Sequence, residues 1–349
     1  MKRILVVRND KIGDFMLAWP SFAMLKRSME CHVTALVPAY TAPLARLCPW
    51  IDEIILDPGA RADKEQQRAL LARIKAAAFD ASICLFSNTR NAKLVWKAHI
   101  PYRLAPATKL AQVLYNHRLV QRRSRSQKPE YEYNLDLVRR FLADQHQAAV
   151  EPQGPYLDFD PASLQQVREQ VATRLKLDAG RPWLMVHAGS GGSANNLSIE
   201  QYSRLIIKLN QACPELQCVL TAGPGEEGKA EQLAAELLAH GGNGWIYRSD
   251  EGLPKFCQVM ANAALFVAGS TGPLHIAAAL DVPTVGFFPA HRSATPLRWR
   301  PLNGEGRHLA FSPPEYSDHP EDMSQLDPKA MAAAIARWAP PFWQESTEQ

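Results

Sequence analysis

Short apolar runs alternate with amphipathic stretches along the whole chain. The first half opens with KRILVVR at residues 2–8, which predicts a buried strand followed by a glycine turn and a helix to about Met29. Three more strand-like runs follow at residues 31–38, 51–56 and 79–86, with helical stretches between them. Strands that alternate with helices predict a parallel, doubly wound sheet.

The pattern lapses near residues 146–161, where Pro, Gln and Gly become frequent, and we interpret this stretch as a linker. A second series of strands and helices follows it. Its strands are expected at residues 183–189, 217–223, 244–248, 265–270 and 283–288. The chain is therefore expected to be of the α/β class, with two Rossmann-like domains at residues 1–150 and 161–325 that face each other across a cleft.

The turn after residues 265–270 has the features of an anion site. Glycines permit a tight turn there, and Pro273 suits the first position of a helix, so a helix is expected to begin at that residue. The first turn of a helix presents unpaired N–H groups and the positive end of the helix dipole. The alternative is an ordinary turn of an α/β sheet, with His275 as a hydrogen-bonded core residue. The candidate anion-binding residues are Ser270, Thr271, Gly272 and His275.

Three other glycine-bearing loops also follow predicted strands: RNDKIGDF, HAGSGGSANN and AGPGEEG. The carboxyl ends of parallel strands meet at one edge of a sheet, so these loops predict a phosphorylated, nucleotide-bearing ligand. A glutamate of the third loop is expected to face a ribose or base, or else to be a solvated helix start. The candidate residues in the second and third loops are Ser190, Gly191, Asn195, Glu226 and Glu227.

Charge is distributed unevenly along the 349 residues, whose net charge is +4. Residues 81–129 contain no acidic residue but six arginines and four lysines, so this segment carries +10 and the remainder −6. Such a surface favours binding to anionic molecules and to an anionic membrane. A mobile, solvated loop is the alternative for residues 122–128. Nucleic acid is not expected, because no nucleic-acid module is recognisable. The candidate binding residues of this segment are Arg90, Lys93, Arg118 and Arg122.

Cysteine spacing and hydropathy give expectations about location. The six cysteines show no CxxC pair, which favours a reducing cytoplasm. The apolar stretches are far shorter than the roughly 20 residues that span a bilayer, so any membrane contact is expected to be peripheral.

Asp14 is the candidate for acid–base chemistry, because it lies just past the first strand at the start of a helix. A carboxylate there either caps the helix or acts as a base. The DFD triplet at residues 158–160 resembles a metal-binding pair but falls in the linker, and the histidines lack ligand spacing. No bound metal and no cofactor are expected.

Taken together, the motifs RNDKIGDFMLAWP, HAGSGG, GPGEE, GSTGPLHIAAALDVPTVGFF and SATPLRW resemble those of glycosyltransferase family 9, the ADP-heptose:lipopolysaccharide heptosyltransferases. The resemblance covers about residues 1–300 and implies a GT-B fold with an amino-terminal acceptor domain and a carboxy-terminal sugar-nucleotide domain. It also implies that residues 326–349, a last helix at about 328–338 and a tail, pack toward the first domain. Asp14 would be the general base, and the turn at residues 270–275 would hold the pyrophosphate. The acceptor-binding residues would be Arg90, Lys93, Arg118 and Arg122, and any membrane contact would be on the inner face of the inner membrane.

The chain departs from the family pattern at two positions. Ser270 stands where many members have Asp, and Asn195 begins a stretch where many have Lys-x-Trp-Pro. The missing lysine removes a cation expected near the leaving phosphate, and we predict that Lys11 supplies part of that charge; a solvated surface lysine is the alternative.

The resulting functional hypothesis is an inverting, metal-independent glycosyltransferase that moves heptose from ADP-heptose to a lipopolysaccharide inner-core acceptor. Two alternatives remain: a transferase for another nucleotide sugar and glycan, and a catalytically silent nucleotide-sugar binding protein.

Overall fold

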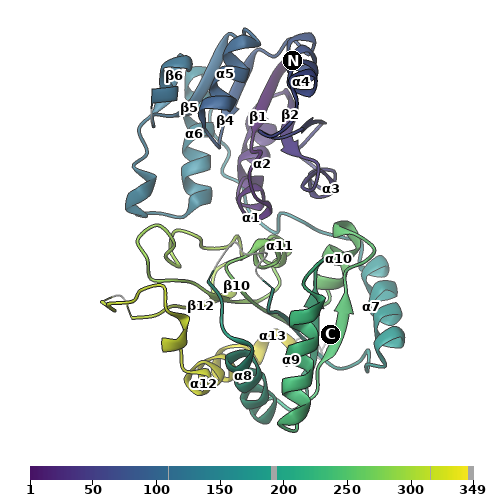
Figure 1. Ribbon diagram of the computed structural model, residues 1–349. Helices are drawn as coiled ribbons and strands as arrows, with labels where there is room; N and C mark the ends of the chain where they lie inside the picture. Colours follow the sequence, from purple (N-terminus) through teal and green to yellow (C-terminus); the bar gives the residue numbers. More distant parts are fainter. Residues whose placement is uncertain (109, 190–194, 315, 345–349) are drawn as a thin grey trace. The chain divides into compact units, whose positions relative to one another are not determined.

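The computed structural model describes residues 1–349 except 109, 190–194, 315 and 345–349. The chain forms two compact units, Met1–Gln153 and Gly154–Gln349 (Figure 1). Each unit contains a parallel six-stranded sheet with helices packed against it, which confirms the α/β class and the two Rossmann-like sheets. The boundary between the units falls inside the stretch interpreted as a linker.

The sheet of the first unit has the order β3-β2-β1-β4-β5-β6. The order reverses between β1 and β4, and ligands of doubly wound sheets bind at such a switch point, beyond the carboxyl ends of the strands. The strands are β1 Lys2–Val7, β2 Cys31–Pro38, β3 Glu53–Asp57, β4 Ala81–Cys84, β5 Tyr102–Pro106 and β6 His117–Leu119. The helices are α1 Ile12–Met16, α2 Trp19–Ser28, α3 Ala42–Ala45, α4 Lys64–Ala76, α5 Thr89–Lys97 and α6 Glu130–Asp144, with 3₁₀ turns η1 Leu110–Leu114 and η2 Arg123–Arg125.

The first unit differs from the sequence prediction in two respects. The helix expected to run to about Met29 is broken between α1 and α2, and Pro20 lies in the first turn of α2, where its missing N–H costs nothing. Strands β5 and β6 were not expected. β6 is a three-residue edge strand that is half-buried or exposed, so it shows no apolar run from which a strand could be predicted.

The sheet of the second unit has the order β12-β11-β10-β7-β8-β9, the same topology, with its switch point between β7 and β10. The strands are β7 Trp183–His187, β8 Gln217–Ala222, β9 Trp245–Arg248, β10 Leu265–Gly269, β11 Thr284–Phe287 and β12 His308–Phe311. The helices are α7 Pro161–Leu175, α8 Ile199–Ala212, α9 Glu227–Ala239, α10 Leu253–Met260, α11 Gly272–Ala279, α12 Pro328–Trp338 and α13 Pro341–Gln344, with η3 Met323–Gln325.

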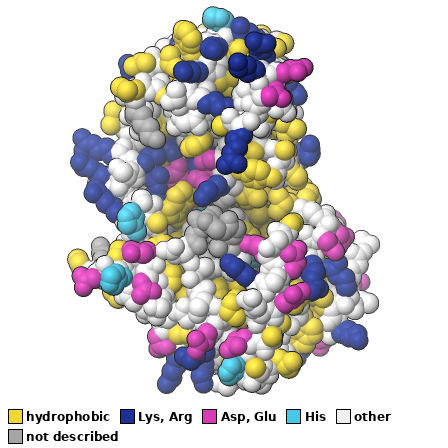
Figure 2. All heavy atoms as spheres, in the orientation of Figure 1, with side chains coloured by type: hydrophobic (Ala, Val, Ile, Leu, Met, Phe, Trp, Pro, Cys, Tyr) yellow, Lys and Arg dark blue, Asp and Glu magenta, His cyan; other side chains and the backbone are white. Residues whose placement is uncertain are grey.

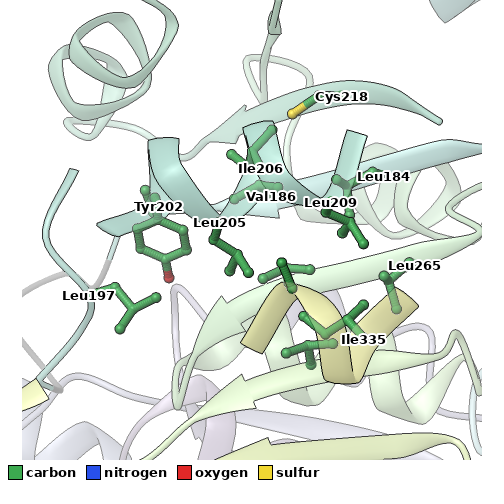
Figure 3. Close-up of a cluster of buried hydrophobic side chains, with 14 of the residues drawn as sticks. Leu184, Val186, Leu197, Tyr202, Leu205, Ile206, Leu209, Cys218, Leu265 and Ile335 are labelled. Carbon is green, nitrogen blue, oxygen red and sulfur yellow. The ribbon is translucent and has the colours of Figure 1, made fainter. Parts of the chain in front are cut away.

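The core of the second unit joins its sheet to α8 and α12. Figure 3 shows apolar side chains of α8 directed toward residues of β7, β10 and α12, with Ile335 of α12 on the opposite side of the cluster. Met331 and Ile335 of α12 are buried against this core. The apolar face of α12 therefore packs against α8 within the second unit. The packing of residues 326–349 toward the first domain, which the family resemblance implies, stays a prediction.

None of the helices in the described part of the chain combines the length and the hydropathy of a membrane-spanning segment. All six cysteines are buried free thiols.

Candidate functional site

A cluster of charged side chains lies at the switch point of the first unit. The Arg8 guanidinium, at the end of β1, is only 2% exposed. Its Nη2 lies 2.5 Å from Asp14 Oδ1, its Nε 3.0 Å from Asp10 Oδ1, and its Nη1 3.5 Å from Glu130 Oε1. Nη1 also donates a hydrogen bond to the Leu85 carbonyl, just beyond β4. Arg8 thus joins the loop after β1 to the end of β4 and to the start of α6.

Glu130 is shared between two arginines. Arg123 Nη1 lies 2.5 Å from the same Oε1 that faces Arg8, and it donates to the Leu85 carbonyl as well. Sequence reasoning did not select Glu130 or Arg123 as site residues. The sequence marks Glu130 only by its position, as the first acidic residue after the acid-free segment. The cluster therefore sets three carboxyl groups against two guanidinium groups.

The surroundings of Asp10 raise the pKa of its carboxyl group. Burial raises the pKa of Asp10 to about 7, and the neighbouring carboxylates of Asp14 and Glu130 add to the rise while Arg8 opposes it. Near neutral pH the Asp10 carboxyl is therefore partly protonated, which reduces the excess negative charge of the cluster. The Asp14 carboxylate keeps 16% side-chain exposure.

A second polar network lies beside this cluster and uses Arg90. The Arg90 guanidinium makes two hydrogen bonds to Asp57, of 2.8 and 2.6 Å, and others to Gln67. Burial alone would raise the pKa of Asp57, but hydrogen bonds from Arg90, Gly59 and Asn9 hold it below its usual value. Arg90, expected to bind the acceptor, is thus already paired within the fold.

The other candidate acceptor residues are exposed. Lys93 lies on α5, Arg118 on β6, and Arg122 just before η2, where its φ of 43° is left-handed. No hydrogen bond or ion pair of these three side chains occurs among the described residues. Lys11 is likewise exposed, precedes the first residue of α1, and forms no ion pair with any residue described here.

The second unit brings the predicted anion-binding residues together at the start of α11. Helix α11 begins at Gly272 with Thr271 as its N-cap residue and Pro273 in its first turn, close to the predicted start. Thr271 is 6% exposed and His275 2% exposed. Within the described part of the chain, neither Thr271 Oγ1 nor His275 Nδ1 has a hydrogen-bond partner. Ser270 is half-buried at the end of β10, and its backbone N–H donates to Phe287.

Two histidines near this turn, the buried His275 and the half-buried His308, are neutral. Burial lowers the pKa of His275 to about 4. Burial, with smaller contributions from His275 and Arg300, lowers the pKa of His308 to about 3. A neutral imidazole carries one N–H and one acceptor nitrogen, so His275 can donate a single hydrogen bond without bringing a charge into the core.

The Glu226 carboxyl group lies next to the end of β7. Its Oε2 lies 3.1 Å from His187 Nε2, and His187 Nδ1 lies 3.1 Å from Thr221 Oγ1. A Cβ built on Gly189 would come within 2.4 Å of the Glu226 carboxyl group, so a glycine is required for this approach. Glu227 is the half-buried first residue of α9.

Asn195 and Asn196 have different environments. The exposed Asn195 donates from Nδ2 to the Glu321 carbonyl, 3.0 Å away. The neighbouring Asn196, which sequence reasoning did not select, donates to the Ala188 carbonyl at 3.1 Å and accepts a hydrogen bond from the Tyr202 hydroxyl at 2.7 Å. Asn196 therefore ties the loop after β7 to α8. The candidates Ser190 and Gly191 lie outside the described residues.

Among the described residues, no group of three or more His, Cys, Asp and Glu side chains is arranged to hold a metal ion.

Comparisons with known proteins bear on the family and the fold of the chain. The model of glycosyltransferase family 9 (heptosyltransferase) matches residues 67–322. A Haemophilus influenzae protein described provisionally as a glycosyltransferase is 49% identical over 99% of both chains. A lipooligosaccharide heptosyltransferase 2 of the same organism is 23% identical over 82% of both chains.

Solved structures share the fold. The Escherichia coli ADP-heptose lipopolysaccharide heptosyltransferase II superimposes with a TM-score of 0.75 at 19% identity, over 99% of this chain and 100% of that chain. The Escherichia coli heptosyltransferase WaaC with ADP gives a TM-score of 0.71 at 20% identity, over 97% and 100% of the two chains. At these identities the likeness shows the fold, which matches the GT-B heptosyltransferases.

Proposed function

The chain belongs to glycosyltransferase family 9, and from this premise we propose that it transfers heptose from ADP-heptose to a lipopolysaccharide inner-core acceptor, with inversion and without a metal. The observation that carries the proposal is the turn between β10 and α11. Thr271 Oγ1 and His275 Nδ1 are buried there without partners among the described residues, at a helix N-terminus. Buried polar atoms rarely lack partners, so a ligand that accepts hydrogen bonds accounts for them.

The donor's diphosphate is the ligand of that turn. The backbone N–H groups at the start of α11 and the Thr271 hydroxyl would donate to phosphate oxygens, and the neutral His275 would add one donor. These donors would stabilise the charge that develops on the departing nucleoside diphosphate. Ser270, Gly272, Asn195, Glu226 and Glu227 would complete the donor site, with a glutamate at the ribose or base.

Asp14 is the general base of this reaction. Its carboxylate would take the proton of the acceptor hydroxyl while that oxygen forms a bond to the anomeric carbon and the bond to the diphosphate breaks. The structure supports this role in two ways: the carboxylate lies at the switch point of the first sheet, and it keeps partial exposure while one oxygen is held by Arg8. Lys11, in the same loop, would supply part of the positive charge that Asn195 does not.

The acceptor and the membrane are proposed to meet the first unit along α5, β6 and the loop that follows. Figure 2 shows Lys and Arg side chains gathered on the side of the first unit where β6 lies in Figure 1, with hydrophobic side chains beside them. Large apolar residues are exposed in the same segment, led by Leu110 at 91%, Val113 at 74% and Val120 at 72%. Among the described residues of this segment, the exposed cations are Lys93, Lys97, Arg118, Arg122 and Arg125.

Exposed apolar side chains among cations suit a peripheral membrane contact. The apolar groups can enter the interface while each basic residue contributes on the order of 1 kcal/mol near an anionic surface. Lys128 adds less than the sequence indicated, because it is paired with Asp136. Flotation with anionic and neutral vesicles should show binding to anionic vesicles that high salt reverses. Changing Arg118, Arg122 and Arg125 to Ser should weaken it; equal flotation of both proteins would remove the membrane role.

The donor is tested by titration calorimetry with ADP, UDP and GDP, followed by turnover assays with the matching sugars. Preferential binding of ADP and release of ADP from ADP-heptose are expected. Binding of another nucleotide with turnover of its sugar would indicate the second transferase hypothesis. Nucleotide-sugar binding without any turnover would indicate a silent binding protein, which the replacement of lysine by Asn195 motivates.

A further inference from the structure

The Arg8 cluster of the first unit points to a role that the family motifs do not assign. We propose that Arg8 is a positioning residue that holds Asp14 in the orientation needed for proton abstraction, and that Glu130 and Arg123 hold Arg8 in turn. This inference rests on the proposed role of Asp14 as the base.

Arg8 can fix the orientation of the Asp14 carboxylate because several contacts hold its own guanidinium group in place. The guanidinium is 2% exposed and contacts groups on three sides: the loop after β1, the end of β4 and the start of α6. A planar guanidinium presents its donors in a fixed fork, so these contacts leave it a single orientation. Nη2, which faces Asp14 at 2.5 Å, therefore points in a defined direction.

Asp14 needs such an anchor because its own helix is short. Helix α1 has five residues, and the chain breaks from it at Leu17 before α2 begins. The Asp14 carboxylate makes no hydrogen bond in the described part of the chain other than that of Oδ1 to Arg8. The second oxygen, on a side chain that is 16% exposed, is left to meet a substrate hydroxyl. Misplacement of a reacting group by about 1 Å can cost about 100-fold in rate.

Glu130 and Arg123 form the outer part of the support. Glu130 is 2% exposed at the first position of α6, and its Oε1 faces both guanidinium groups. Arg123 Nε donates to Gln121 Oε1 at 2.8 Å, and Gln121 Nε2 donates to the Tyr133 carbonyl at 2.5 Å. These bonds link residues 121–133 to the carboxylate proposed as the base. Arg122 and Arg125, proposed to face the membrane, lie in the same segment.

A merely structural role is the competing explanation, because a buried ion cluster that loses one member destabilises any fold. The two roles differ in how they combine with a change at Asp14. If Arg8 acts through Asp14, substitution of Arg8 should not lower kcat further in a protein that already lacks the base. If Arg8 only supports the fold, its effect persists whether or not the base is present.

The experiment compares Arg8→Lys, Asp14→Asn and the double variant by kcat, acceptor KM and ADP affinity. Lysine keeps the charge but loses the planar fork. We expect Arg8→Lys to lower kcat about 10- to 100-fold, to leave ADP affinity unchanged, and to cause no further loss in the Asp14→Asn background. Arg139→Lys is the matched control, because Arg139 on α6 also pairs with three carboxylates, Glu132, Asp136 and Glu151. It should keep the wild-type kcat.

Glu130→Gln repeats the test with a change outside the reacting loop, and it decides the matter if Arg8→Lys does not fold. It should lower kcat about 10-fold, again with no additional effect on the Asp14→Asn protein. Wild-type kcat in both folded variants, or a loss that persists without the base, would overturn the positioning role. Full turnover by Asp14→Asn alone is a separate result, which removes the base assignment and hence the proposed mechanism.

Discussion

The two units use the same sheet topology to build sites of opposite character. At the first switch point, the buried Arg8 and the half-buried Arg123 face three carboxyl groups, and burial raises the pKa of Asp10 to about 7. At the second, His275 and His308 are neutral, because the loss of solvent around each ring lowers their pKa values to about 4 and about 3.

The difference teaches what each half of the proposed reaction requires. A base must remain a carboxylate next to a hydroxyl, so its surroundings supply fixed cations that compensate it. A diphosphate already carries the charge, so its site supplies neutral donors and a helix N-terminus. Topology places both sites at the carboxyl ends of strands, and the side chains decide what each can do.

Asp14→Asn tests the charged site and should have the largest effect. The amide preserves shape but cannot accept the proton, so kcat should fall by about 10²–10⁴-fold while ADP affinity is retained. Single-turnover assays together with calorimetry separate the two quantities. Wild-type turnover would show that the proton goes elsewhere.

Thr271→Val and His275→Ala test the neutral site. Each removes a hydrogen-bond donor to the diphosphate, so ADP affinity should weaken by about tenfold, the cost of one hydrogen bond to a charged group. Thermal unfolding of each variant without ligand is the control, since both residues are buried. Unchanged affinity in a folded variant would place the phosphates at another turn.

Lys11→Met tests whether a cation of the first unit helps to bind the diphosphate of the donor. Lys11 is exposed and has no ion pair in the part of the chain that the structure describes, so its removal should leave stability unchanged. If it compensates for Asn195, ADP affinity or kcat should fall by a few fold, as expected of an exposed cation. A protein that keeps both values would leave Lys11 as a solvated side chain.

The titrating groups of the two sites should change the free energy of unfolding in opposite directions as the pH changes. The pKa of His275 is 6.5 in the unfolded chain and about 4 in the folded one, so below pH 6.5 the unfolded state binds more protons. Its contribution to the unfolding free energy is therefore present above pH 6.5 and lost as pH falls toward 4. His308 acts in the same direction.

Asp10 acts in the other direction. Its pKa rises from 3.8 to about 7, so its contribution is present below pH 3.8 and lost as pH rises toward 7. In thermal unfolding at pH 4 to 7, His308→Gln should flatten the loss of stability toward acid pH, and Asp10→Asn should flatten the loss toward neutral pH. In the wild-type melting temperature the two trends should cancel in part. Identical slopes in all three proteins would contradict the assigned titrations.

The amino-acid sequence alone determined the α/β class, the alternation of strands and helices, and the turns that carry Asp14 and Thr271. These features are local: apolar runs bury strands, and glycine and proline permit particular backbone angles at particular positions. Nine strands followed from such runs, whereas β5 and the edge strands β6 and β12 did not.

Tertiary structure alone decided which side chains meet. Arg8 and Glu130 lie 122 residues apart, and only the pairing of β1 with β4 and the start of α6 brings them into one cluster. The same holds for Arg90, an exposed cation by sequence pattern, which the fold pairs with Asp57. Ion pairs and hydrogen bonds form only between groups a few ångströms apart in space. The number of residues between two groups does not give that distance, because the folded sheets determine it.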